Sequence, residues 1–254
     1  MERPLIICDD ISDIARRSAS KFFDIADDSI SKRGIFYTAL SGGTTPESLY
    51  RLLSRDKFKE RLKWNNVQFF WGDERCVEPD HADSNYRMAF NALLGKIDLP
   101  DKNIHRIMAE KGERAASDYE KEIRKVFDIQ GDAIPQFDLI LLGMGNDGHT
   151  ASLFPGSMAI RENKRLATAL YVEKLNTERI TITPPLINNA LHIIFLISGR
   201  KKADALCQVL KGEYMPDKFP AQLVRHSKGE VFYFVDKEAA GMQKMLTRYQ
   251  TGSK

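Results

Sequence analysis

Short apolar runs alternate with helical patterns from one end of the chain to the other. Strands group apolar residues or alternate them with polar ones, whereas helices repeat them every three or four positions. Strands are expected at Leu5–Cys8, Ile35–Leu40, Val67–Trp71, Leu139–Leu142, Arg179–Thr183, Leu191–Ile197 and Val231–Val235. Helices are expected over about Ile11–Ala26, from about Pro46, over Tyr86–Leu94 with Asp83 or Ser84 as the cap, over roughly Ala109–Phe127 and over Lys201–Leu210.

The order of these elements predicts the fold class. Strands that alternate with helices form a mostly parallel, doubly wound sheet flanked by helices. No Pro/Ser/Gly-rich linker, charge block or internal repeat divides the chain. We therefore expect one α/β domain over residues 1–254, with some excursions from the main sheet.

The stretch Asp138–Gly156, which reads DLILLGMGNDGHTASLFPG, carries the strongest functional signal. Its apolar run has the composition of a strand buried on both faces, and ligands of open α/β sheets bind beyond the carboxyl ends of such strands. The glycines that follow allow sharp turns, and His149 among them can act as a general base near neutral pH. No serine lies in the G-x-S-x-G pattern of a nucleophile elbow, and nothing nearby marks Ser152 as activated. A catalytic or binding loop is therefore expected here.

The same stretch also matches the dinucleotide-binding pattern G-x-G-x-x-G at Gly143–Gly148. That pattern needs a helix after its third glycine, because the helix N-terminus receives the pyrophosphate. Here Pro155 and Gly156 leave room for only a short turn, and the pattern lies in the middle of the chain. A nicotinamide or flavin site is therefore disfavoured, and no cofactor is expected.

A second loop, Ser41–Pro46, follows the expected strand Ile35–Leu40 and reads SGGTTP. Its glycines expose backbone N–H groups, its hydroxyls add donors, and a helix N-terminus follows, a combination that suits phosphate. The alternative is a tight turn with a Ser/Thr cap, which needs no ligand. Phosphate binding is favoured because the loop has more donors than a turn needs, although it lacks the G-x-x-x-x-G-K-[ST] pattern of a P-loop.

The triplet Asp73-Glu74-Arg75 is expected on a third loop, after the aromatic strand Val67–Trp71. Charged groups on a surface loop are usually solvated and contribute little. At the carboxyl end of a strand, the same residues can bind or polarise an anionic sugar. Both interpretations stay open from these residues alone.

Composition and charge limit the class of protein. The 254 residues are 43% apolar and 29% charged, as in ordinary globular proteins, and no run approaches the ~18 apolar residues of a membrane span. The net charge of +3 is too small to indicate a nucleic-acid surface. Cys8, Cys76 and Cys207 show neither disulfide nor metal spacing, and the N-terminus lacks the apolar region of a signal peptide. We expect a cytoplasmic protein without a membrane, nucleic-acid or metal partner.

Five segments together resemble the 6-phosphogluconolactonase family, within the larger group of glucosamine-6-phosphate deaminase and ribose-5-phosphate isomerase-like proteins. The segments are LSGGTTPESLY, WGDERCVEPDHADSNYRMA, DLILLGMGNDGHTASLFPG, RITITPPLINNA and PAQLV with GEVFYFVD, and they lie in this order from about residue 40 to residue 236. Each segment alone is unspecific, but the joint pattern is highly specific. Two departures are small: Glu78 stands where relatives often have proline, and Thr44 keeps the hydroxyl of a common serine.

The resemblance implies a Rossmann-like single domain that hydrolyses 6-phospho-D-glucono-1,5-lactone to 6-phosphogluconate. It also implies that His149 is the base that activates water, that Asp147 helps to organise the loop, and that Asp73 and Arg75 line the substrate. A δ-lactone is an activated ester, so neither a metal nor a covalent intermediate is required. The expected partner is the small phosphorylated sugar lactone, and the expected state is a monomer or a weak homo-oligomer.

For the substrate phosphate, the resemblance implies contacts from the second loop and from two basic residues. These residues are Ser41, Gly42, Gly43, Thr44, Thr45, Arg179 and Lys202. Without the resemblance, Arg179 is equally well explained as a strand-edge charge, and Lys202 as part of a solvated helix face.

Two alternatives to the hydrolase remain. Amino-sugar-phosphate deaminases of the same fold place a catalytic glutamate where this chain has Phe154, which cannot titrate. A sugar-phosphate sensor would carry a DNA-binding module, and none is expected because the first strand begins by Leu5 and the chain ends soon after Val235. A binder that keeps the loop but has lost turnover also fits the sequence.

Overall fold

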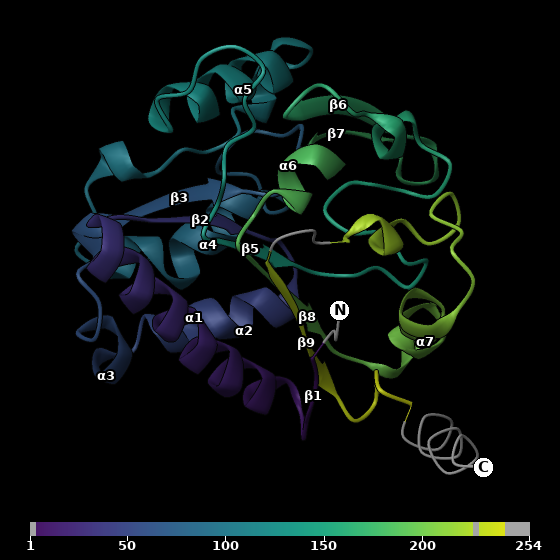
Figure 1. Ribbon diagram of the computed structural model, residues 1–254, viewed down its shortest axis with the longest axis horizontal. Coiled ribbons are helices and arrows are strands. Elements are labelled where there is room, and N and C mark those ends of the chain that lie inside the picture. Colours follow the sequence, from purple (N-terminus) through teal and green to yellow (C-terminus); the bar gives the residue numbers. More distant parts are fainter. Residues whose placement is uncertain (1–3, 226–228, 242–254) are drawn as a thin grey trace.

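A parallel sheet forms the centre of the structure, a computed structural model that describes residues 4–225 and 229–241 (Figure 1). Within these residues the sheet has six strands, in the order β1-β9-β8-β5-β2-β3. Their bounds are β1 Leu5–Cys8, β2 Phe36–Leu40, β3 Val67–Trp71, β5 Leu139–Leu142, β8 His192–Ile197 and β9 Glu230–Asp236. Neighbouring strands run parallel, so the predicted doubly wound α/β fold is confirmed. The ends of the predicted domain, residues 1–3 and 242–254, lie outside the described residues.

A second, antiparallel sheet was not predicted from the sequence. Its strands are β4 Asp73–Arg75, β6 Ala167–Val172 and β7 Thr177–Ile182, in the order β4-β7-β6. The prediction that Asp73–Arg75 is a loop is therefore wrong, because Asp73 pairs with Thr181 and Arg75 with Arg179. Three charged residues carry no strand pattern of their own, and their conformation depends on the partner strand β7.

The helices occupy the connections between strands. They are α1 Ile11–Arg33, α2 Thr44–Leu53, α3 Asp56–Lys59, α4 Asn85–Ala92, α5 Arg114–Val126, α6 Pro184–Asn188 and α7 Ala203–Lys211. Short 3₁₀ helices are η1 Trp64–Asn66, η2 Leu94–Lys96, η3 Asp101–Asn103, η4 Ala109–Lys111, η5 Met158–Arg161, η6 Glu173–Leu175, η7 Arg200–Lys202 and η8 Pro220–Leu223. The prediction of one helix over Ala109–Phe127 is wrong at its start, because Gly112 has a φ of 62° and separates η4 from α5.

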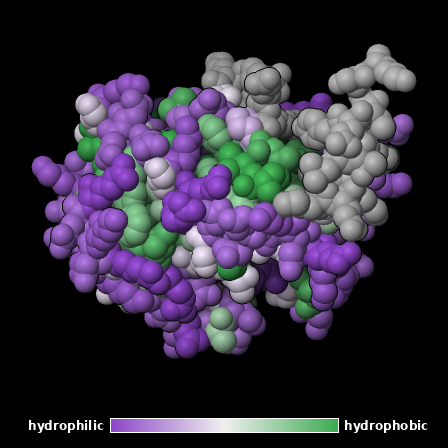
Figure 2. Space-filling model, turned by 90° about the horizontal axis from the view of Figure 1, so that it is seen from below, coloured by the Kyte–Doolittle hydropathy of each residue, from purple (hydrophilic) through white to green (hydrophobic). Residues whose placement is uncertain are grey.

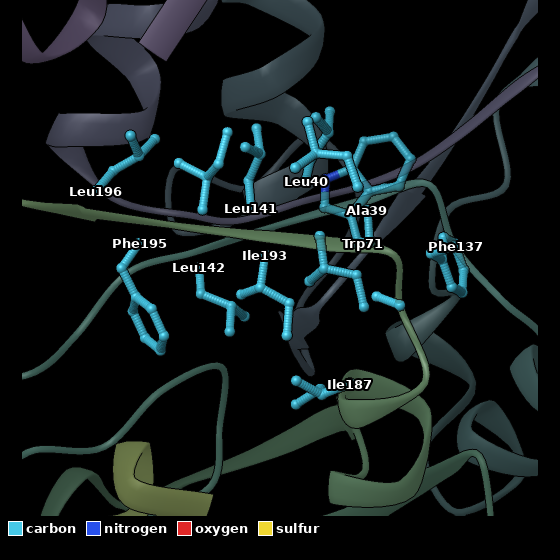
Figure 3. Packing of buried hydrophobic residues seen from close by; sticks show 14 of the residues in the cluster. Ala39, Leu40, Trp71, Phe137, Leu141, Leu142, Ile187, Ile193, Phe195 and Leu196 are labelled. Carbon is cyan, nitrogen blue, oxygen red and sulfur yellow. The ribbon is translucent and has the colours of Figure 1, made fainter. Parts of the chain in front are cut away.

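Apolar side chains pack on both faces of the parallel sheet. Leu141 and Leu196 point to one face, whereas Leu142 and Phe195 point to the other (Figure 3). This alternation follows from the two-residue period of a strand. Helices α1 and α2 pack together against the first face, and Ile187 of α6 lies on the second (Figures 1 and 3).

Helix α1 shows how local signals set the ends of an element. The Asp10 side chain accepts hydrogen bonds from the backbone N–H groups of Ser12 and Asp13, and Gly34 ends the helix with a φ of 76°. One face of α1 is buried and the other carries charged residues.

Among the described residues, no helix is long and apolar enough to cross a membrane. The face shown in Figure 2 is mostly hydrophilic.

Two tyrosine hydroxyls hold the carboxyl ends of β2 and β3. The Tyr50 hydroxyl of α2 accepts from the Ser41 N–H and donates to the Ser41 carbonyl, both at 2.9 Å. The Tyr119 hydroxyl of α5 makes the same two contacts with Trp71, both at 2.8 Å. Burial raises the pKa of both tyrosines, so both hydroxyls stay protonated. The tyrosines thus fix the backbone where the two functional segments begin.

Replacing Tyr119 by Phe leaves both backbone groups of Trp71 without this partner. We expect the free energy of unfolding to fall by about 1–3 kcal/mol in urea titrations. The half-exposed Tyr214 offers a matched control, because Tyr214→Phe should change stability by less than about 0.5 kcal/mol. Equal stabilities of the two variants would contradict the role assigned to Tyr119.

Candidate active site

The loop after β5, residues 143–154, folds back on itself. The Gly145 N–H donates to the His149 carbonyl at 2.8 Å, and the Gly148 N–H donates to the Gly145 carbonyl at 3.1 Å. Gly148 has a φ of 78°, a conformation that favours glycine. The Thr150 hydroxyl donates to the Gly143 carbonyl at 2.8 Å and closes the loop onto its own start. The loop is therefore held by its own hydrogen bonds beyond the end of the buried strand.

His149 forms a dyad with Asp147. The His149 Nδ1 lies 2.6 Å from Asp147 Oδ1, and the His149 backbone N–H donates to the same oxygen at 3.2 Å. A carboxylate on Nδ1 selects the tautomer with a proton on that nitrogen, which leaves the Nε2 lone pair as the proton acceptor. Only glycine fits beside the dyad, because a Cβ on Gly145 would lie 2.1 Å from Nδ1.

The carboxylate of Asp147 stays ionised. Burial alone would raise the pKa of Asp147, but hydrogen bonds from His149 and Lys174 outweigh it and hold the pKa well below its usual range. Lys174 Nζ donates to Oδ2, the oxygen that His149 does not use. Lys174 was not predicted as a site residue, because this residue lies between β6 and β7 and no sequence motif includes it.

Phe154 packs directly on the imidazole. The two ring centroids are 4.2 Å apart, and Lys174 Nζ lies 4.7 Å from the Phe154 centroid. Phe154 therefore contacts both partners of Asp147. It stands where the sequence analysis noted that the deaminases carry a catalytic glutamate.

Asp73 is held from two sides. Its Oδ2 accepts from the Ser152 hydroxyl at 2.6 Å, and its Oδ1 accepts from Asn85 Nδ2 at 3.3 Å. The Ser152 N–H in turn donates to the Thr181 hydroxyl of β7 at 3.2 Å. Ser152 thus connects the 143–154 loop to two strands of the small sheet, β4 and β7, and its hydroxyl donates to Asp73.

Glu74 has a structural role. Its carboxylate accepts from the backbone N–H groups of Asn85 and Tyr86, both at 2.8 Å, and from the Ser84 hydroxyl at 3.2 Å. Burial raises the pKa of Glu74, and the hydrogen bonds from the backbone N–H groups oppose the rise. The Glu74 side chain therefore joins β4 to the N-terminus of α4. Ser84, one of the two residues predicted as the N-cap, caps this helix.

Arg75 and Arg179 lie side by side as cross-strand partners in β4 and β7. Both Nε atoms are buried, and neither has a hydrogen-bond partner within residues 4–225 and 229–241. Burial lowers the pKa of Arg179 and the charge of Arg75 lowers it further, whereas the charges of Asp73, Glu74 and Asp83 raise it. Like charges placed opposite each other are unfavourable unless an anion joins them. The pair is therefore suited to bind a phosphate or a carboxylate.

The Ser41–Thr45 loop lies next to the 143–154 loop. A Cβ on Gly143 would lie 3.7 Å from the Ser41 hydroxyl, and a Cβ on Gly42 would collide with Asn85 at 1.9 Å. Gly43 has a φ of 103° and precedes α2, whose start has no side-chain cap. The Ser41 N–H is already bonded to Tyr50. Among the described residues, the backbone N–H groups of Gly42, Gly43, Thr44 and Thr45 donate to no protein group and are the available donors.

Lys202 reaches the 143–154 loop from the segment after β8. Its Nζ donates to the Met144 carbonyl, and the side chain is half-buried. Burial lowers the pKa of Lys202, whereas the charge of Asp147 raises it. The alternative of a solvated helix face is therefore wrong for Lys202, which faces the loop with the dyad.

Residues 9–233 match the family model described as "Glucosamine-6-phosphate isomerases/6-phosphogluconolactonase". The chain belongs to this family. Among its relatives, the 6-phosphogluconolactonase of Synechocystis sp. is 42% identical over 212 residues, which cover 83% of this chain and 85% of that protein. The 6-phosphogluconolactonase of Nostoc sp. is 37% identical over 245 residues, which cover 96% of this chain and 99% of that protein.

Solved structures of 6-phosphogluconolactonases have the same fold as this chain. The 6-phosphogluconolactonase from Trypanosoma cruzi has a TM-score of 0.84 at 32% identity and covers 94% of this chain and 96% of its own. The enzyme from Trypanosoma brucei has a TM-score of 0.86 at 27% identity, with 95% and 98% covered. A monomeric glucosamine-6-phosphate deaminase reaches a TM-score of 0.78 at 21% identity, with 94% and 99% covered, which shows a shared fold alone.

The structure brings some of the predicted residues of this family member together beyond the carboxyl end of β5. His149, Asp147 and Lys202 meet at the 143–154 loop, and Ser152 connects that loop to Asp73. Arg75 and Arg179 lie in β4 and β7 of the small sheet, and β4 also contains Asp73. Among the described residues, no group of three or more His, Cys, Asp or Glu side chains is arranged to hold a metal ion.

Gly145→Ala tests the geometry of the dyad. The added Cβ would lie 2.1 Å from His149 Nδ1 and 2.7 Å from Asp147 Oδ1, so the imidazole must move. We expect kcat for the family's lactone reaction to fall about 100-fold, the usual result of a catalytic group displaced by 1 Å. The matched control is Gly143→Ala, whose Cβ would make only an ordinary contact at 3.7 Å and should cost less. Wild-type kcat in Gly145→Ala would contradict the assigned geometry.

Proposed function

We propose that this protein hydrolyses 6-phospho-D-glucono-1,5-lactone to 6-phospho-D-gluconate. Its family membership and its relatives named 6-phosphogluconolactonase support this activity. The observation that carries the proposed mechanism is the His149–Asp147 dyad, in which Nδ1 is bonded and Nε2 is left as the base. Phe154 packs on that ring in place of an acid, which argues against the deaminase reaction.

In the proposed reaction, His149 Nε2 takes a proton from a water molecule as the water oxygen bonds to the lactone carbonyl carbon. The tetrahedral intermediate then collapses, and the bond between that carbon and the ring oxygen breaks. The imidazolium returns the proton to the departing ring oxygen. Asp147 holds the ring in one tautomer and stabilises its positive charge during the step. No covalent bond to the protein is needed.

The substrate phosphate is proposed to bind at three basic side chains of the site, those of Arg75, Arg179 and Lys202. Arg179 and its neighbour Arg75 have buried Nε groups without partners among the described residues. The start of α2 adds backbone donors beside Thr44 and Thr45, and Lys202 lies at the neighbouring 143–154 loop. Guanidinium and ammonium groups bind phosphate through charge-assisted hydrogen bonds, so these groups would orient the ring toward His149.

A reducing cytoplasm remains the predicted location of the protein, and a monomer or weak homo-oligomer remains its predicted oligomeric state.

A direct assay tests the activity. The lactone is generated with glucose-6-phosphate dehydrogenase, and its disappearance is followed with and without the purified protein. Acceleration above the spontaneous rate is expected, and it should be much weaker with unphosphorylated gluconolactone. Binding of 6-phosphogluconate without any acceleration would instead favour the non-catalytic binder.

His149→Ala removes the proposed base and should lower kcat by about 10²–10⁴-fold. His192 provides the control, because it lies at the amino end of β8, away from the strand ends that carry the site. His192→Ala should keep kcat within about twofold of wild type, since it removes no group of the proposed mechanism. A wild-type kcat in His149→Ala would exclude this residue as the base.

Arg179→Ala and Lys202→Ala remove proposed phosphate contacts. We expect KM to rise about 10- to 100-fold with a smaller change in kcat, because each lost contact involves two charged groups. Lys201→Ala is the matched control, since Lys201 is exposed and adjacent to Lys202 in the chain. The phosphate assignment fails if KM for the phosphorylated lactone stays unchanged in both variants.

A further inference from the structure

Lys174 lies where the hairpin formed by β6 and β7 meets the 143–154 loop. The two strands pair antiparallel up to Val172 and Thr177, and η6 forms the turn between them. At the other end of β7, the Thr181 hydroxyl accepts a hydrogen bond from the Ser152 N–H of the same loop. The hairpin therefore contacts the loop both through β7 and through its tip.

The two oxygens of Asp147 have different partners. Oδ1 faces Nδ1 of His149 at 2.6 Å, and Oδ2 accepts from Lys174 Nζ. With both oxygens engaged, the carboxylate cannot rotate without losing one contact. Lys202 adds a further positive charge near Asp147 but directs its Nζ to the Met144 carbonyl. Lys174 is thus the cation that fixes the carboxylate.

Phe154 is a second contact of the Lys174 ammonium group. Lys174 Nζ lies 4.7 Å from the Phe154 ring centroid, and the same ring packs against the His149 imidazole with the centroids 4.2 Å apart. Cation–π attraction therefore adds to the ion pair. An ion pair between half-exposed side chains contributes little to folding stability, so its main consequence is geometric.

We propose that Lys174 is a positioning residue for the hydrolysis, which fixes the Asp147 carboxylate so that His149 presents Nε2 to water. This inference rests on the proposed function. Lys174 acts through Asp147 and needs no contact with the substrate. A substrate-binding lysine would change KM, whereas a positioning lysine changes kcat.

Kinetics of three variants test this role. Lys174→Met keeps the length of the side chain without its charge, and we expect kcat to fall about 10-fold with KM within about twofold of wild type. Lys174→Arg keeps the charge and should recover at least about half of the wild-type kcat. The exposed Lys164 provides the control, and Lys164→Met should match wild type. An unchanged kcat in Lys174→Met, or a rise in KM alone, would overturn the inference.

A second readout does not depend on turnover. In an NMR titration of the labelled carboxyl carbon, the pKa of Asp147 should be higher in Lys174→Met than in wild type, because one of the cations that lower it is gone. Lys174→Arg should restore the low pKa of Asp147, and an unchanged pKa in Lys174→Met would overturn the inference. If the variants show these pKa differences but the wild-type protein does not hydrolyse the lactone, the proposed function fails while the Lys174–Asp147 contact stands.

Discussion

The site depends on one constraint of a parallel sheet: its strands stop at the same edge, and the backbone there must find other partners. Tyr50 satisfies Ser41 after β2, and Tyr119 satisfies Trp71 at the end of β3. After β5, the Thr150 hydroxyl bonds to the Gly143 carbonyl. Three neighbouring strand ends are thereby held by side chains, and the segments that leave them keep a defined path.

Charge is divided unevenly across this edge. Asp147 has both oxygens engaged, one with His149 and the other with Lys174, so the dyad is neutralised from within the protein. Arg75 and Arg179 have buried Nε groups without partners among the described residues. The phosphate of a substrate can bind to Arg75 and Arg179 without disturbing the contacts of Asp147 with His149 and Lys174. This division separates binding from proton transfer, and it suits a neutral lactone ring attached to a phosphate.

Much of the architecture could be predicted because it depends on local patterns. Strands β1 and β3 have the predicted bounds, since both are short apolar runs. The strand β4 could not be predicted, because Asp73–Arg75 are extended only through pairing with β7. Lys174 was missed for a similar reason: its partner Asp147 lies 27 residues earlier, and only the hairpin brings them together. Motifs revealed the dyad, which is local, but not the contacts between distant segments.

The central claim is that the phosphate binds at Arg179 and Lys202 while the reacting carbon lies at His149. A crystal structure with bound 6-phosphogluconate tests this most directly. The account predicts the phosphate in hydrogen-bond contact with Arg179 or Lys202, and the C1 carboxylate about 3–3.5 Å from His149 Nε2, the distance of a productive complex. A product bound in the reverse direction, with its phosphate at His149, would contradict the account.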